Sequence, residues 1–161
     1  MVSQDYADFF HRHSTRSEAA AKDSLSLPEW NKSDWEKLLS LTTPRTVRTG
    51  EFVISRNVAD RALYLVASGE YEVGVMHVGG ASMRPIANIT AGSVIGDQSF
   101  FDGQPRSANV WAGSAGVLLQ LEFTAYEQFV RAEPVLAGNL VFALGRVLSM
   151  RLRSTTLRAS N

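Results

Sequence analysis

Residues 96–108 read Gly96-Asp97-Gln98-Ser99-Phe100-Phe101-Asp102-Gly103-Gln104-Pro105-Arg106-Ser107-Ala108. The glycine and the acid predict the start of one helical turn, with Asp97 as its N-cap, and Arg106 closes the loop beside the hydroxyl of Ser107. The first backbone N–H groups of a helix favour negative charge, and a guanidinium group matches two phosphate oxygens at once. The segment is therefore predicted to bind a phosphate group.

The segment lies within a region whose pattern is typical of an all-β protein. From residue 45 to residue 123, short runs rich in valine, isoleucine, tyrosine and threonine are broken by glycine roughly every ten residues. Gly79 and Gly80 are expected at the tip of a hairpin between the Tyr71–His77 and Arg84–Ile89 runs. About eight short strands favour a mainly β fold with flanking helices, an eight-stranded jelly-roll barrel of the cupin-like kind. The predicted strands are Val47, 52–54, 62–66, 71–76, 84–89, 93–95, 108–112 and 117–123.

Helices are expected on both sides of this roll. Ser33 and Glu36 have the spacing of a capping box, and Trp30 is placed to staple the start of that helix. After a short helix over 124–131, Pro134 opens a long one. We predict a weakly patterned N-terminal extension or linker over 1–29, with room for one helix, and one domain over 30–161, with the roll at about 45–123 and C-terminal helices over 124–158.

The long helix has more than one apolar stripe. Leucines recur at every fourth residue, a spacing that drifts around the helix, so one part can pack on the roll while another meets a second subunit. These leucines are Leu136, Leu140, Leu144, Leu148 and Leu152. Gly138 and Gly145, which are unfavourable inside a helix, indicate close packing there. A homodimer through this helix is therefore a possible assembly.

The 96–108 segment resembles the phosphate-binding cassette of the cyclic nucleotide-binding domain family, which runs Phe-Gly-Glu-x-(Ala/Ser)-Leu, a short spacer, and Pro-Arg-(Ser/Thr/Ala)-Ala. The matching residues are Ile95, Gly96, Asp97, Ser99, Phe100, Pro105, Arg106, Ser107 and Ala108. Residues 50–54 and 63–73 look like the opening strands of that family, and residues 133–137 look like the start of its closing helix. The resemblance covers about residues 44 to 153.

This resemblance implies a regulatory module that binds a cyclic nucleoside monophosphate, with cAMP favoured and cGMP open, and that transmits binding through its C-terminal helix. Arg106 would pair with the cyclic phosphate, Ser107 would donate a hydroxyl, and N–H groups around Ser99 and Phe100 would complete the cradle. The implied binding residues are Gly96, Asp97, Gln98, Ser99, Arg106, Ser107 and Ala108.

The chain departs from the family pattern at two places. Asp97 stands where the family has a glutamate that accepts a hydrogen bond from the ribose 2′-hydroxyl, and it is one methylene shorter, so it must move toward the sugar or reach it through water. Asn57 stands where the family usually has a glycine before an acidic turn. Asparagine tolerates the left-handed conformation, so this turn is expected to survive.

Composition excludes several other functions. Sixteen basic residues balance sixteen acidic ones, so no net field steers the chain to nucleic acid, and the absence of cysteine removes thiolate chemistry. The histidines are His11, His13 and His77, and only His77 falls in the β region, so a three-histidine cupin metal site is not expected. No nucleophile elbow, Walker loop or paired carboxylates are found. We expect no enzyme activity, no cofactor and no metal.

Targeting signals and DNA-reading elements are also not expected. The N-terminus has no basic-then-apolar run, and the apolar Val135–Leu144 segment contains Asn139 and precedes Arg146, so we expect a cytoplasmic protein without a membrane span. The sequence stops at Asn161 without a helix-turn-helix, so direct DNA binding is not expected. The alternative interpretation is a degenerate domain of the same family that serves for dimerisation or partner docking without nucleotide.

Overall fold

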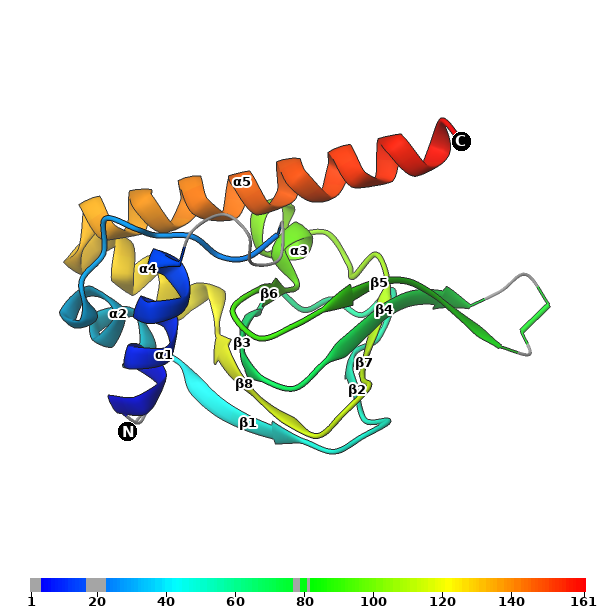
Figure 1. Ribbon diagram of the computed structural model, residues 1–161, viewed down its shortest axis with the longest axis horizontal. Helices are drawn as coiled ribbons and strands as arrows, with labels where there is room; N and C mark the ends of the chain where they lie inside the picture. Colours follow the sequence, from blue (N-terminus) through cyan, green and yellow to red (C-terminus); the bar gives the residue numbers. More distant parts are fainter. Residues whose placement is uncertain (1–3, 17–22, 77–78, 81) are drawn as a thin grey trace. The chain divides into compact units, whose positions relative to one another are not determined.

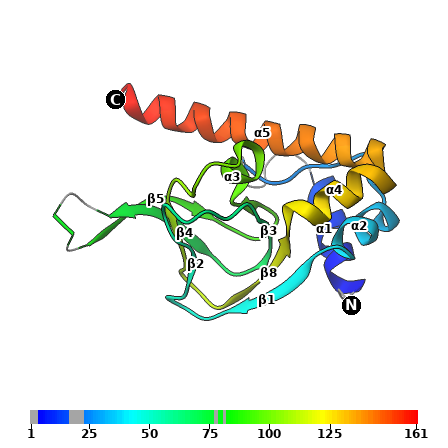
Figure 2. The same ribbon diagram turned by 180° about the vertical axis from the view of Figure 1, so that it is seen from behind.

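The computed structural model describes residues 4–16, 23–76, 79–80 and 82–161. The chain divides into two compact units, a helical one formed by Met1–Leu41 with Thr124–Asn161 and a β unit formed by Thr42–Phe123. Figures 1 and 2 show the course of the chain through both units.

The β unit contains the eight strands that the sequence predicts. They form two antiparallel four-stranded sheets, in the orders β1-β8-β3-β6 and β2-β7-β4-β5 (Figure 1). Helix α3 (Asp97–Asp102) joins β6 to β7. The strands are β1 (Thr43–Val47), β2 (Phe52–Ile54), β3 (Leu63–Ser68), β4 (Tyr71–Met76), β5 (Met83–Ile89), β6 (Val94–Ile95), β7 (Asn109–Ala112) and β8 (Gly116–Leu121). The mainly β prediction with a jelly-roll barrel is confirmed.

Alternating side chains from both sheets form one apolar core. In β7, Val110 and Ala112 are buried while Asn109 and Trp111 are partly exposed, as expected for a strand with one face toward a core. The buried cluster comprises Val47, Val53, Ile54, Ala62, Tyr64, Val66, Tyr71, Ile89, Ile95, Val110, Ala112 and Leu118. This core fixes the ends of β3, β6 and β7, between which the cassette lies.

The β4–β5 hairpin has glycines in the loop, as predicted. Gly79 and Gly80 have φ angles of 120° and 75°, a region that favours glycine. His77, which the sequence places at the end of the preceding run, lies outside the described residues.

In the helical unit, the N-cap of α2 (Lys32–Leu39) lies two residues before the expected one, Ser33. Its N-cap is Asn31, whose Oδ1 accepts from the backbone N–H of Asp34 at 3.0 Å, while Asp34 Oδ2 accepts from the N–H of Asn31 at 3.0 Å. The Ser33–Glu36 prediction is therefore wrong, because an earlier pair with the same spacing forms the reciprocal bonds. The predicted staple is present, since the rings of Trp30 and Trp35 lie 5.0 Å apart, edge to face.

Part of the segment predicted as an extension forms helix α1 (Gln4–Thr15), which packs against α2. The ring of Phe10 stacks on Trp35 with centroids 5.3 Å apart, and the N–H of Leu27 donates to Ser14 Oγ at 2.5 Å. The alanine-rich stretch at 19–21 lies outside the described residues. A domain boundary at residues 29 and 30 stays a prediction.

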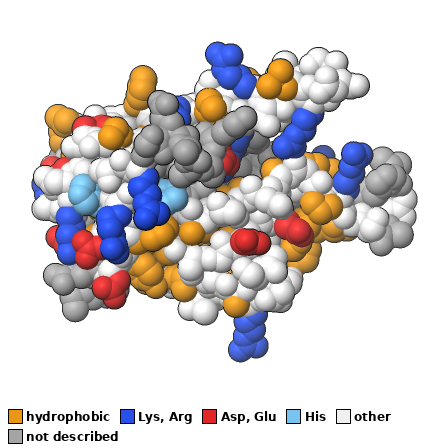
Figure 3. Space-filling model, viewed as in Figure 1, with side chains coloured by type: hydrophobic (Ala, Val, Ile, Leu, Met, Phe, Trp, Pro, Cys, Tyr) orange, Lys and Arg blue, Asp and Glu red, His pale blue; other side chains and the backbone are white. Residues whose placement is uncertain are grey.

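Two C-terminal helices complete this unit. Helix α4 (Phe123–Ala132) is followed by α5 (Pro134–Ala159), which Pro134 opens as predicted. Gly138 and Gly145 do not pack closely against any described residue, because a Cβ atom added at either would meet none of their atoms within 4 Å. Figure 3 shows separate hydrophobic and basic side chains along the top of the view, where α5 runs.

Among the described residues, α5 is the one helix whose length and composition would allow it to cross a membrane. A single such helix is weak evidence, because helices of soluble proteins also meet the same criterion.

Candidate functional site

The cassette begins at Gly96, where β6 ends and α3 starts. Gly96 is the N-cap of α3 and has a φ angle of 85°, so Asp97 is the first helical residue and not the cap that the sequence predicts. A Cβ atom at residue 96 would lie 2.5 Å from Arg106 Nη1 and 2.9 Å from Ala62 O. Glycine is therefore required twice, once for the backbone angle and once for the close approach of Arg106.

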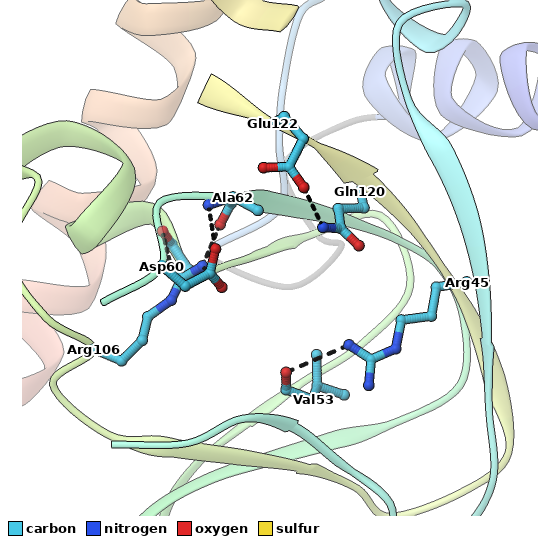
Figure 4. Close-up of polar contacts among 8 residues, drawn as sticks. Arg45, Val53, Asp60, Ala62, Arg106, Gln120 and Glu122 are labelled. Atoms are coloured by element: carbon cyan, nitrogen blue, oxygen red, sulfur yellow. Dashed lines mark hydrogen bonds and ion pairs between the residues drawn. The ribbon is translucent and has the colours of Figure 1, made fainter. Parts of the chain in front are cut away.

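Arg106 is buried, with 3% of its surface exposed, and its guanidinium group holds three segments together. Nη1 donates to Gly96 O at 3.0 Å, and Nη2 donates to Ala62 O at 2.6 Å and to Asp60 Oδ2 at 2.7 Å. Figure 4 shows Asp60, Ala62 and Arg106 converging in this way. Nε is buried and has no hydrogen-bond partner among the residues that the structure describes. One charged donor of the group is therefore not used by the protein itself.

Asp60 is a residue of the site that sequence analysis did not identify. Burial would raise the pKa of its carboxyl group, but hydrogen bonds from Arg106 and from the N–H of Ala62, with the charge of Arg106, lower the pKa below its ordinary value. Asp60 is thus held as a carboxylate beside Arg106. The sequence placed Asp60 in an acidic turn after Asn57, which could have marked it as a candidate. It did not indicate the contact with Arg106, because the two residues are far apart in sequence.

The other predicted binding residues lie around α3 and the loop after it. Ser99 is buried, whereas Gln98 and Ser107 are exposed and Ala108 is partly buried, just before β7. The hydroxyl of Ser107 donates to Gln98 Oε1 at 2.7 Å. The structure thus brings Gly96 together with Arg106, and Gln98 together with Ser107. Asp97 is 6% exposed, at the start of α3.

The expected turn at residue 57 is present. Asn57 has a φ angle of 67° and is the sole non-glycine residue with positive φ in the described part of the chain. Asparagine adopts this left-handed conformation more readily than most residues, because its short polar side chain can form hydrogen bonds with the nearby backbone.

Metal-binding groups are not found in the described residues, which contain no cluster of three or more histidine, aspartate or glutamate side chains suited to a metal ion. The β-region histidine, His77, lies outside this part of the structure.

A family model described as "Cyclic nucleotide-binding domain" matches residues 44–133. The chain is also 34% identical over 119 residues to the "Cyclic AMP receptor protein" of Thermus thermophilus, a match that covers 74% of this chain and 53% of that protein.

Solved structures show the same fold. A cyclic nucleotide-binding domain from Methylobacillus flagellatus KT superposes with a TM-score of 0.81 at 21% identity, covering 96% of this chain and 83% of that one. The Catabolite Activator Protein of Thermus thermophilus gives a TM-score of 0.67 at 30% identity, covering 83% and 59% of the two chains.

The matched curated relatives are longer, since this chain corresponds to 53% of the Thermus protein and to 24% of a Mycobacterium tuberculosis protein named "Uncharacterized NTE family protein Rv2565". The family model covers more than half of this chain and extends over the roll, the cassette and the start of the C-terminal helices. With its glycine-opened α3 and buried Arg106, the chain belongs to the cyclic nucleotide-binding domain family.

Proposed function

We propose that this chain binds a cyclic nucleoside monophosphate, preferentially cAMP, at the cassette formed by residues 96–108. The observation that carries the proposal is the buried guanidinium group of Arg106, which is fixed by Gly96, Ala62 and Asp60 and keeps Nε as an unused donor. A buried charged donor of this kind is costly unless an anion completes its hydrogen bonds. A cyclic phosphate supplies such an anion.

The remaining residues of the cassette then have distinct roles. Ser107 offers a hydroxyl, which exchanges its bond to Gln98 for one to a phosphate oxygen, and the first N–H groups of α3 face the same charge. Asp97 accepts from the ribose 2′-hydroxyl, directly or through water. Gly96 lets the guanidinium group of Arg106 approach the backbone, and Ala108 has a small side chain beside the ligand.

We propose that α5 transmits the binding of the nucleotide and that its partner is a second copy of this chain. One exposed stripe of α5 has alternating spacings of three and four residues, the pattern of a two-helix seam. It consists of Val135, Gly138, Phe142, Gly145, Ser149, Leu152 and Thr156. The open glycines permit close approach of a second helix.

The same stripe supports the second candidate, a domain that dimerises or docks a partner without nucleotide. Such a domain needs no ligand. It is consistent with the ion pair between Arg106 and Asp60, because this pair already balances much of the positive charge of Arg106. In both cases we propose that this chain performs no chemistry, takes no cofactor, does not contact DNA directly and is located in the cytoplasm.

Titration calorimetry with cAMP and cGMP tests the proposal. We expect the wild-type protein to bind cAMP and Arg106→Ala to lose about a hundredfold or more in affinity, because breaking a buried charge pair costs roughly 3 to 5 kcal/mol. Arg56→Ala is the matched control, since Arg56 is an exposed arginine of the neighbouring turn. Circular dichroism shows whether each variant is folded. Absence of binding by the folded wild type would favour the nucleotide-free candidate.

A further inference from the structure

Arg61 holds the end of α3 that is opposite to the predicted phosphate cradle. Its Nε donates to Phe100 O at 3.0 Å, and its Nη2 donates to Phe101 O at 3.2 Å. Carbonyl groups at the end of a helix lack partners within the helix and carry partial negative charge. A planar guanidinium group can bind two of them at once, whereas an ammonium group has no such fork.

The same guanidinium group lies on the ring of Phe123, with Cζ 3.5 Å from the ring centroid. A cation over an aromatic face is attracted by the electron-rich ring. The ring of Phe123 also meets that of Phe100 edge to face, with centroids 5.3 Å apart. Phe123 is the first residue of α4, so these contacts connect α3 with the point where the chain leaves the β unit.

We propose that Arg61 is a positioning residue that couples α3 to the start of α4. One rigid guanidinium group makes both hydrogen bonds and the ring contact, so a shift of the end of α3 relative to Phe123 would disturb at least one of them. The part of this inference that concerns nucleotide rests on the proposed function: a shift of α3 on binding would be carried through Arg61 to α4, and from there along the chain to α5.

A simple helix-capping role is the competing explanation. A cap would stabilise α3 alone, and the ring of Phe123 would serve only as packing for the arginine side chain. The two explanations differ in whether removing the guanidinium group changes α4, because both hydrogen bonds of Arg61 described above go to α3.

Hydrogen exchange followed by mass spectrometry on the whole chain distinguishes them without ligand. We expect Arg61→Met to speed exchange about tenfold in both α3 and α4, as expected from the loss of hydrogen bonds to a charged group. Arg61→Lys removes the fork that binds α3 and should affect both helices as well. Arg56→Met removes an exposed charge nearby and should leave both helices unchanged.

A faster α3 with an unchanged α4 in Arg61→Met would overturn the coupling and leave Arg61 as a cap. If that variant does not fold, Arg61→Lys decides the question by the same criterion. A second arm repeats the measurement with cAMP. We expect cAMP to change exchange in both α3 and α4 of the wild type but only in α3 of Arg61→Met. The affinity of this variant for cAMP should stay within about threefold of the wild-type value. A wild type that binds no cyclic nucleotide would defeat the proposed function, while the ligand-free arm still decides the coupling.

Discussion

The backbone N–H of Asn57 donates a hydrogen bond of 2.8 Å to the carbonyl oxygen of Arg106. The N–H of Arg106 in turn donates to Val58 O at 3.0 Å. The backbone of the phosphate-binding candidate is therefore fixed by a turn in which Asn57 has a φ angle of 67°. This relationship links one departure from the family pattern to the geometry of the site.

The first prediction concerns the conformation of residue 57. Asn57→Gly should leave stability within about 0.5 kcal/mol, because glycine also adopts positive φ, while Asn57→Ala should lower it by about 1 kcal/mol. Thermal denaturation monitored by circular dichroism measures both. Equal stability of the alanine and glycine variants would show that the left-handed turn is not under strain.

The second prediction compares two glycines with nearly the same backbone angle. Gly50 and Gly96 have φ angles of 83° and 85°, but a Cβ atom at residue 50 would meet no atom of the described part of the chain within 4 Å. Gly50→Ala should cost only the backbone strain, about 1 to 2 kcal/mol, whereas Gly96→Ala should cost more and weaken cyclic nucleotide binding, because the new methyl group displaces Arg106. Similar losses of stability in both variants, with binding intact, would contradict this prediction.

The third prediction is the pH dependence of the Asp60–Arg106 pair. The pKa of Asp60 is lowered from its ordinary 3.8 in the folded protein, so its carboxylate contributes stability above that value. This contribution is lost as the pH falls through the lower folded pKa. Wild type should exceed Asp60→Asn in melting temperature at pH 7, and the difference should shrink between about pH 4 and pH 2. A constant difference over this range would mean that the carboxylate charge does not stabilise the fold.

Most strands were predictable because short runs rich in valine, isoleucine, tyrosine and threonine, broken by glycine, are visible in a single sequence. The position of α3 was predictable because glycine and an acid open it and Asp102-Gly103 closes it. Such signals are local and can be read within a few residues.

Contacts between distant residues were not predictable in the same way. Nothing in the sequence pairs Asp60 with Arg106 or Arg61 with Phe123, because the fold alone brings these segments together. The capping box of α2 failed for a different reason, since Asn31–Asp34 and Ser33–Glu36 overlap and both fit the spacing. The glycines of α5 indicated close packing, but no atom of the described residues lies within 4 Å of a Cβ atom added at Gly138 or Gly145.

The fourth prediction tests the stripe on α5. Phe142 is 81% exposed in the single chain, and Phe142→Glu would place like charges opposite each other in a paired seam. We expect the wild type to dimerise in analytical ultracentrifugation and this variant to weaken dimerisation about a hundredfold or more. Leu157→Glu is the control, because Leu157 is 67% exposed but lies outside the stripe. Equal dimerisation of both variants would exclude the stripe as the interface.

The last prediction concerns the shortened acid at the start of the cassette. Asp97→Glu should raise affinity for cAMP, because the added methylene carries the carboxylate toward the ribose and restores a direct hydrogen bond. The gain is expected to be about tenfold, equal to ~1.4 kcal/mol. No cap is lost in this variant, since the N-cap of α3 is Gly96.

Titration of both proteins with cAMP and 2′-deoxy-cAMP measures this gain and identifies its source. The deoxy ligand lacks the hydroxyl, so it should bind both proteins equally while cAMP favours the glutamate variant. Asp97 is 6% exposed, so the longer side chain must also fit, and a melting temperature is needed for each protein. A folded glutamate variant without improved affinity, together with equal binding of cAMP and its deoxy form by the wild type, would show that Asp97 does not contact the ribose. The proposed binding mode would then rest on Arg106 and Ser107 alone.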